Sequence, residues 1–347
     1  DRTEPFEGAS GIVHPLLSES ITQFQAQAYR ELLPAGGPVR VEIVGEENPA
    51  IVAQAERVKQ YMNYEIMNVM EEFDPELDQM LFYLPIVGST FKKIYFDPLL
   101  QRAVSKFVHA EDIIVPYSAT DLLTASRITH VVKMTNNDIL KMQLSGFYKN
   151  VDLPSYGSSS TDYSDIQEEI DKADGIMSSN EQDDLTIYEI HTNIDIEGFE
   201  DMDTEGNPSG LKLPYIVSIL EKTGEILAIR RNYDQNDPLM MKKQYFVHYK
   251  FLPGLGFYGF GLTHMMGGLS KASTSLLRQL IDAGTLSNLP AGFKARGARI
   301  RDEDTPLAPG EFRDIDSAGG DIRQSLMPLP FKEPSGTLYN LLGIQLV

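Results

Sequence analysis

Four glycines precede the longest helical pattern of the chain, and their spacing is one that phosphate-binding loops use. They are Gly254, Gly256, Gly259 and Gly261. The first three satisfy G-x-G-x-x-G, which in dinucleotide-binding proteins follows a strand and opens a helix. Here a predicted strand over Gln244–Phe251 comes before the glycines, and a predicted helix begins near Leu262. A nucleotide-binding enzyme is therefore one hypothesis, and a mechanical hinge that starts a closely packing helix is the other.

A dinucleotide site needs more than these glycines. An acidic residue should end a second strand about 20 residues further on, where it binds the ribose. Asp282 has this offset but lies within the predicted helix. Phe257 and Tyr258 are also bulky for a loop that must approach a pyrophosphate. The sequence therefore favours the hinge.

A second candidate site is the acidic run DMDTEG, in which Asp201, Asp203 and Glu205 resemble the start of a calcium-binding loop. Such a loop ends in glutamate, but that position is Lys212, and Pro208 interrupts the run. An acidic hairpin tip is favoured, and a calcium-stabilised tail or adhesion protein stays open as an alternative. The six histidines have no ligand spacing, and cysteine is absent. The sequence predicts no catalytic residue, no cofactor and no metal site.

One concentrated basic patch lies beyond the long helix. It consists of Lys294, Arg296, Arg299 and Arg301. Lys294 and Arg296 share a face if the segment is a strand, and the acidic residues 302–304 follow at once. The patch is either an ordinary solvated hairpin or a surface that contacts a phosphate backbone or an acidic partner. The sequence leaves both interpretations open.

Composition narrows the class of protein. The 347 residues are 42% hydrophobic and carry a formal charge of −20, which indicates globular domains that repel nucleic acid at long range. Tight wrapping of DNA is thus disfavoured, whereas a protein that lets DNA slide past would tolerate the charge. No run of 18 apolar residues occurs, so no membrane span is predicted. The chain starts at Asp1 and stops at Val347 within a helical pattern, as expected of a fragment trimmed at both ends.

Apolar periodicity predicts an α+β fold. Residues 1–250 form a body with an antiparallel sheet and a polar insertion at 155–184. A helix is expected over Leu16–Leu33, and Asn48 followed by proline starts an apolar stripe that continues to Phe73. Asp74-Pro75 repeats the same start signal. Eight strands are expected, over 89–96, 102–107, 113–115, 127–134, 185–196, 215–221, 225–232 and 244–251. A short helix over 136–144 follows the fourth of them.

The helix after the glycines is predicted over about 262–287. Its first half is rich in small residues, which let helix axes approach closely. They are Gly267, Gly268, Ser270, Ala272 and Ser273. Lys271 and Arg278 are placed on its polar face. Short strands separated by Pro and Gly follow over 291–331, and Pro334 begins a second helical pattern.

Several long blocks, in one order, resemble a known family. GFYGFGLTHMMGGLSKASTSLLRQLIDAGTLSNLPAGF is similar to the stem region of portal proteins of tailed bacteriophages, in particular the large portals of short-tailed phages. PFEGASGIVHPLLSESITQFQAQAYRELLPAGGPV, GSTFKKIYFDP and VHAEDIIVPYSATDLLTASRITHVV resemble the wing domain of the same family. The resemblance implies the portal fold: an α/β wing, long stem helices and a small β-rich clip.

Carried over by position, the wing is residues 1–250. The glycine hinge and first stem helix are residues 251–288, the clip is 289–333, and the truncated start of the second stem helix is 334–347. The tunnel loop and crown of the family would lie beyond Val347.

The resemblance also implies a function. Portal subunits form a ring, usually of twelve copies, at one capsid vertex of the virion. Double-stranded DNA is pumped through the ring by a separate terminase ATPase during assembly in the host cytoplasm, and leaves through it at infection. The clip docks the terminase large subunit and later the head-to-tail adaptor, and a major capsid or scaffolding protein surrounds the ring. Lys271 and Arg278 would then contact DNA or a neighbouring stem.

Overall fold

The computed structural model describes residues 9–154, 184–202, 207–288, 292–294, 299–300, 315–316, 326–328 and 333–345. The chain divides into two compact units, which are considered separately below. We call residues 21–262 the body, and residues 1–20 together with 263–347 the α6 unit after its main helix. Among the described helices, none combines the length and the apolar character needed to cross a membrane.

Four α-helices begin before or within the body. They are α1 (Leu16–Leu32), α2 (Pro49–Tyr64), α3 (Phe73–Val87) and α4 (Asn136–Leu144). The predicted start of α2 is confirmed, because the Asn48 side chain accepts a hydrogen bond from the backbone N–H of Ala50 at 3.1 Å. The predictions of α1 and α4 are confirmed as well.

The predicted single helix from Pro49 to Phe73 is wrong. The α-helix ends at Tyr64, a π-helical turn spans Glu65–Val69, and α3 begins at Phe73, so Asp74 lies in its first turn instead of capping it. The apolar rows of α2 and α3 are continuous in sequence but have different environments: α3 buries its row, and α2 buries no residue.

The carboxylates at the start of α3 lie against the edge of a sheet. Glu72 pairs with Arg102 at 2.7 Å and accepts a hydrogen bond from the backbone N–H of Ser105 at 3.1 Å. Glu76 accepts another from the backbone N–H of Phe107. These contacts fix where α3 begins and occupy backbone donors that an edge strand would otherwise leave free.

The body holds two antiparallel sheets where the sequence suggested one. The first has the order β2-β1-β8, with β1 at Ser89–Asp97, β2 at Arg102–Val108 and β8 at Phe246–Lys250. The predicted hairpin of β1 and β2 is confirmed by their register, in which Asp97 pairs with Arg102. The last strand, β8, pairs with β1 and not with its sequence neighbour β7, which separates the sheets.

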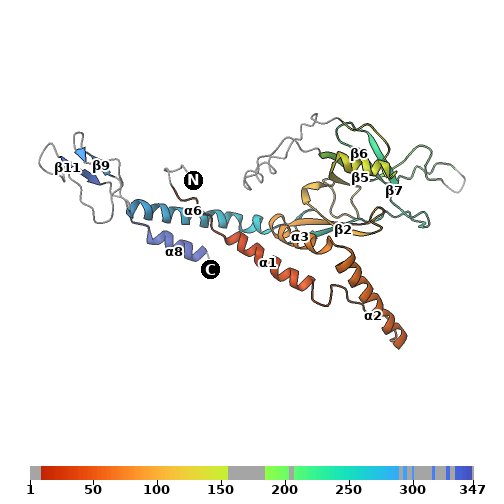
Figure 1. Ribbon diagram of the computed structural model, residues 1–347, viewed down its shortest axis with the longest axis horizontal. Helices are drawn as coiled ribbons and strands as arrows, with labels where there is room; N and C mark the ends of the chain where they lie inside the picture. Colours follow the sequence, from red (N-terminus) through yellow and green to blue (C-terminus); the bar gives the residue numbers. More distant parts are fainter. Residues whose placement is uncertain are drawn as a thin grey trace. The chain divides into compact units, whose positions relative to one another are not determined.

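The second sheet has five strands in sequence order, β3 to β7 (Figure 1). They are β3 (Ile113–Ile114), β4 (Arg127–Thr135), β5 (Asp184–Ile194), β6 (Leu213–Leu220) and β7 (Ile226–Arg231). All neighbours pair antiparallel. The predicted turn between β6 and β7 is confirmed, since the N–H of Gly224 donates to the carbonyl of Leu220 at 2.8 Å.

A buried apolar cluster joins elements of both sheets. Phe91 of β1, Ile128 of β4, Phe246 of β8 and Phe257 of the glycine turn all belong to it. Phe91 is fully buried, and its ring stacks on that of Phe257 with 6.0 Å between centroids. The glycine turn is therefore part of the core of the body.

The α6 unit is built on one long helix. The predicted helix is confirmed as α6 (Leu262–Asn288), and the helical pattern after Pro334 as α8 (Gly336–Gln345). Between them, β9 (Gly292–Lys294) pairs with β12 (Leu326–Pro328), and β10 (Arg299–Ile300) pairs with β11 (Ile315–Asp316) (Figure 1).

Candidate functional site

The glycine turn packs backbone against backbone at the end of α3. A Cβ atom on Gly259 would lie 2.6 Å from the carbonyl oxygen of Leu252, and one on Gly261 would lie 2.6 Å from that of Ile86. At Gly254 a Cβ would overlap the carbonyl oxygen of Tyr258. Gly256 differs, because nothing lies within 4 Å of the corresponding position. Three of the four predicted glycines are thus required by close approach.

Two of the backbone donors that would cradle a phosphate are already used. The backbone N–H of Gly259 donates to Ser89 Oγ at 2.8 Å, and that of Phe260 donates to the carbonyl of Leu252 at 2.9 Å. Phe257 points into the core, and the Tyr258 hydroxyl donates to the carbonyl of Ile113 at 3.1 Å. Because a phosphate site needs free, converging N–H groups, this turn does not fit a nucleotide.

Ser89 and His248 hold the turn, and sequence reasoning missed both. His248 Nε2 lies 3.1 Å from Ser89 Oγ, and its ring stacks on those of Phe91 and Phe257, with 4.4 and 4.7 Å between centroids. Burial, together with the nearby charge of Lys250, lowers the pKa of His248 to about 4. A serine beside a histidine could suggest a nucleophile, but Ser89 is buried and its oxygen accepts the N–H of Gly259. The pair is structural.

A groove on α6 contains both predicted basic residues. Lys271 and Arg278 line a groove of about 680 Å³, together with the small residues Gly267 and Ser270. Its other wall is the N-terminal strap, which we define as residues 9–15, and the first turn of α1. Both residues of the predicted polar face therefore lie in one groove, and their contact with DNA or a neighbouring stem stays a prediction.

The N-terminal strap is hydrogen-bonded along α6 at intervals of one helical turn. The backbone N–H of His14 donates to Thr274 Oγ1 at 3.1 Å. Arg278 Nε donates to the carbonyl of Ile12 at 2.7 Å. The backbone N–H of Ser10 donates to Asp282 Oδ1 at 2.7 Å. Arg278 thus binds the chain's own backbone, whereas Lys271 in the same groove is exposed.

The remaining small residues of α6 have different environments. Ser273 is fully buried and Ala272 is half-buried. No atom lies within 4 Å of a Cβ added at Gly268. Close packing of these residues against another stem stays a prediction.

Two other predicted sites lie largely outside the described residues. Lys294 is in β9 and Arg299 is in β10, where only the backbone is described, and Arg296 and Arg301 are not described. Of the acidic run, Asp203 and Glu205 are not described, and Asp201 accepts a hydrogen bond from the Ser209 hydroxyl at 2.6 Å. The described residues contain no group of three or more His, Asp or Glu that could hold a metal ion.

A buried ionic cluster joins the two sheets of the body. Lys93 Nζ of β1 lies 2.7 Å from the Glu189 carboxylate of β5, which His191 Nε2 contacts at 2.7 Å. Burial alone would raise the pKa of Glu189. The hydrogen bonds and charges of His191 and Lys93 have the larger effect and hold this pKa well below its usual range. Burial, with the Lys93 charge, lowers the pKa of His130 to about 3. The charged groups of this cluster contact one another and are shielded from solvent, and we assign it to stability.

These features define a class of fold: an α+β protein whose body holds two antiparallel sheets and whose second unit is built on a long, grooved helix. A family model described as phage SU10 portal protein matches residues 100–345, which is most of the chain. The protein therefore belongs to the phage SU10 portal protein family. The family is a structural component of phage capsids and implies an oligomeric ring. No curated protein matches the chain.

Proposed function

We propose that the chain is a subunit of a ring-shaped channel at one capsid vertex, through which double-stranded DNA is packaged and later ejected. The observation that carries this proposal is the family match over 100–345, which includes α6, the four short strands and α8 in one continuous region. In the proposal, residues 1–250 are the wing, 251–288 the hinge and first stem helix, 289–333 the clip, and 334–347 the start of the second stem helix.

The proposed partners follow from this assignment. A separate terminase ATPase supplies the energy of packaging, and its large subunit docks on the clip, as the head-to-tail adaptor does afterwards. A major capsid or scaffolding protein surrounds the ring, which assembles in the host cytoplasm from twelve copies. The charge of −20 supports a conduit, because a wall that repels phosphates does not retain the passing duplex.

Electron microscopy of the purified protein in negative stain tests the proposal. Rings with a central channel, together with no ATP hydrolysis by the isolated protein, are the expected result. A protein that stays monomeric at high concentration, or that hydrolyses ATP by itself, would contradict it. Calorimetric titration with nucleotides gives a second check, and no heat of binding is expected.

A further inference from the structure

Helix α6 binds the N-terminal strap through the backbone of the strap. Three α6 side chains, spaced by four residues, hydrogen-bond alternate residues of the strap. They are Thr274, Arg278 and Asp282, and their partners are His14, Ile12 and Ser10. Four helical residues rise about 6 Å and two extended residues rise about 6.6 Å, so the two repeats match. This mode of binding therefore depends on spacing and does not depend on the side chains of the strap.

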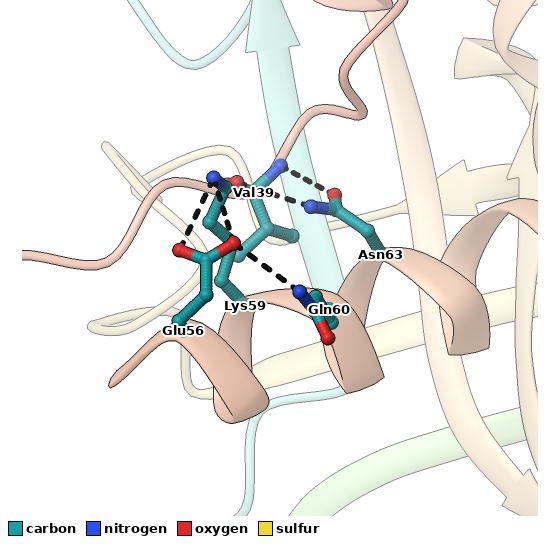
Figure 2. Close-up of polar contacts among 5 residues, drawn as sticks. All are labelled: Val39, Glu56, Lys59, Gln60 and Asn63. Carbon is teal, nitrogen blue, oxygen red and sulfur yellow. Dashed lines mark hydrogen bonds and ion pairs between the residues drawn. The ribbon is translucent and has the colours of Figure 1, made fainter. Parts of the chain in front are cut away.

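The body contains a contact of the same kind. The Asn63 side chain of α2 accepts a hydrogen bond from the backbone N–H of Val39 at 2.9 Å and donates one to its carbonyl at 3.3 Å (Figure 2). Val39 lies in the connection between α1 and α2, outside helices and strands. A single amide side chain on a helix can thus bind both backbone groups of one residue in a non-helical segment.

A second row of α6 side chains has the same spacing of four residues. It consists of Lys271, Ser275 and Gln279, which we call the open row. All three residues are exposed, and all three line the groove of about 680 Å³. The open row lies about 60° around the helix from the residues that bind the strap. Within the described part of the chain, none of the three makes a hydrogen bond or an ion pair. The groove therefore repeats, beside the strap, a spacing that binds backbone.

We propose that the open row binds an extended segment of a partner protein, and that an acidic side chain of this segment pairs with Lys271. From Lys271 to Gln279 the helix rises about 12 Å, the length of about four extended residues. Ser275 and Gln279 supply hydrogen bonds to backbone, and the pair with Lys271 supplies specificity. The proposal goes beyond the channel function and concerns the subunit by itself.

The local charge of α6 favours an acidic segment. Lys271, Arg278 and Asp282 are the charged residues of α6, so this helix carries two positive charges and one negative, although the whole chain carries −20. Charges farther away than about 10 Å are largely screened in physiological salt, so the local excess acts on a segment in the groove. Arg278 and Asp282 bind the strap, which leaves Lys271 for a carboxylate. Tight binding of DNA would need several phosphate contacts, and the described lining offers one unpartnered cation.

The chain contains no cysteine, which allows a site-specific test by disulfide exchange on the full chain. The single thiol of Ser275→Cys is equilibrated in a thiol buffer with acetyl-Thr-Val-Cys-Val-Asp-amide or with the same peptide ending in Lys-amide. Two residues separate the thiol from the acidic side chain, which matches the spacing between Ser275 and Lys271. The acidic peptide should be captured at least about fivefold more than the basic one, since an ion pair forms in one case and like charges meet in the other.

Matched variants assign this preference to the groove. Leu269→Cys, which is exposed on α6 and does not line the groove, should capture both peptides equally. In the Ser275→Cys chain, Lys271→Arg should retain the preference and Lys271→Glu should reverse it. Equal capture of the two peptides at position 275 would overturn the proposal, and so would an equal preference for the acidic peptide at position 269.

Two other occupants of the groove give different results in the same assay. If a DNA duplex blocks capture of both peptides at position 275 and neither peptide is preferred, the groove is a phosphate-binding surface. If the thiol at position 275 shows no preference in subunits and becomes unreactive in assembled rings, a neighbouring stem covers the groove. Either result would overturn the proposal. Because the assay uses the subunit, its outcome is independent of whether rings form.

Discussion

Gly256 and Gly259 differ in how much room the fold leaves for a side chain. We expect Gly259→Ala to lower the free energy of unfolding by about 1–3 kcal/mol, because its Cβ would lie 2.5 Å from the carbonyl oxygen of Gly88 and backbone must move. Gly256→Ala should be neutral or stabilise by up to about 1 kcal/mol, since the position is open. Urea unfolding of both variants checks this, and the opposite order would contradict the steric argument.

The same pair separates the two hypotheses that the sequence offered for the turn. A nucleotide site would depend on Gly256, because its backbone would have to approach the phosphates. If the turn serves only to pack backbone against backbone, the stability of the fold depends on Gly259 and does not change with Gly256. The sequence singled out four glycines, and backbone approaches closely at Gly254, Gly259 and Gly261 but not at Gly256. Their partners, Gly88 and Ser89, could not be, because the two segments are about 170 residues apart and only the fold brings them together.

Acid should destabilise the body through the half-buried His248 and His130. The folded-state pKa of His248 is about 4 and that of His130 about 3, both below the ordinary value of 6.5. The unfolded chain therefore binds more protons, so the contribution of these groups is complete above pH 6.5 and is lost as the pH falls towards 4. Each histidine can add a slope of up to about 1.4 kcal/mol per pH unit.

His248→Phe keeps an aromatic ring in contact with Phe91 and Phe257 but removes the titrating group. We expect the decrease in unfolding free energy between pH 6.5 and 4.5 to be smaller in this variant than in the wild type, as measured by urea midpoints at several pH values. An unchanged slope in His248→Phe would show that this histidine does not titrate on unfolding.

At the scale of the element, the N-terminal strap depends on single side chains of α6. Arg278→Ala removes the hydrogen bonds to the carbonyls of Ile12 and Gly11. Bonds to a charged donor contribute about 1.5–3 kcal/mol each, so the strap should open more often. Hydrogen exchange at the amides of Ser10 and His14 should accelerate at least tenfold. Lys271→Ala, in the same groove, should leave exchange unchanged; acceleration in both variants would mean general loosening of α6.

Local sequence patterns predicted most helices and strands, but they could not predict contacts between residues far apart in the sequence. The hairpin of β1 and β2 and helices α4 and α6 follow from periodicity and turn residues that lie within the element. The strap on α6 joins residues about 270 positions apart, and its bonds are made by ordinary backbone groups that carry no sequence signal. The end of α2 at Tyr64 was missed because its apolar spacing continues unchanged to Phe73.

For the whole molecule, charge is distributed unevenly along the chain. The net charge is −20, yet four basic residues fall within positions 294–301, in the proposed clip. Arg296→Glu with Arg299→Glu should leave ring formation intact and weaken docking of the terminase or the adaptor, because a local positive surface would become negative. A pull-down with either partner measures the effect, which should be larger at low than at high ionic strength.

A matched control separates this local effect from the change in total charge. Lys149→Glu with Lys243→Glu changes the net charge by the same amount at two exposed positions of the body. If repulsion by the whole ring governed docking, both pairs of substitutions would weaken it equally, since each adds four negative charges per subunit. If the basic patch contacts the partner, only Arg296→Glu with Arg299→Glu should weaken docking. Unchanged docking in the first pair would instead identify the patch as a solvated hairpin, neutralised by the acidic residues that follow it.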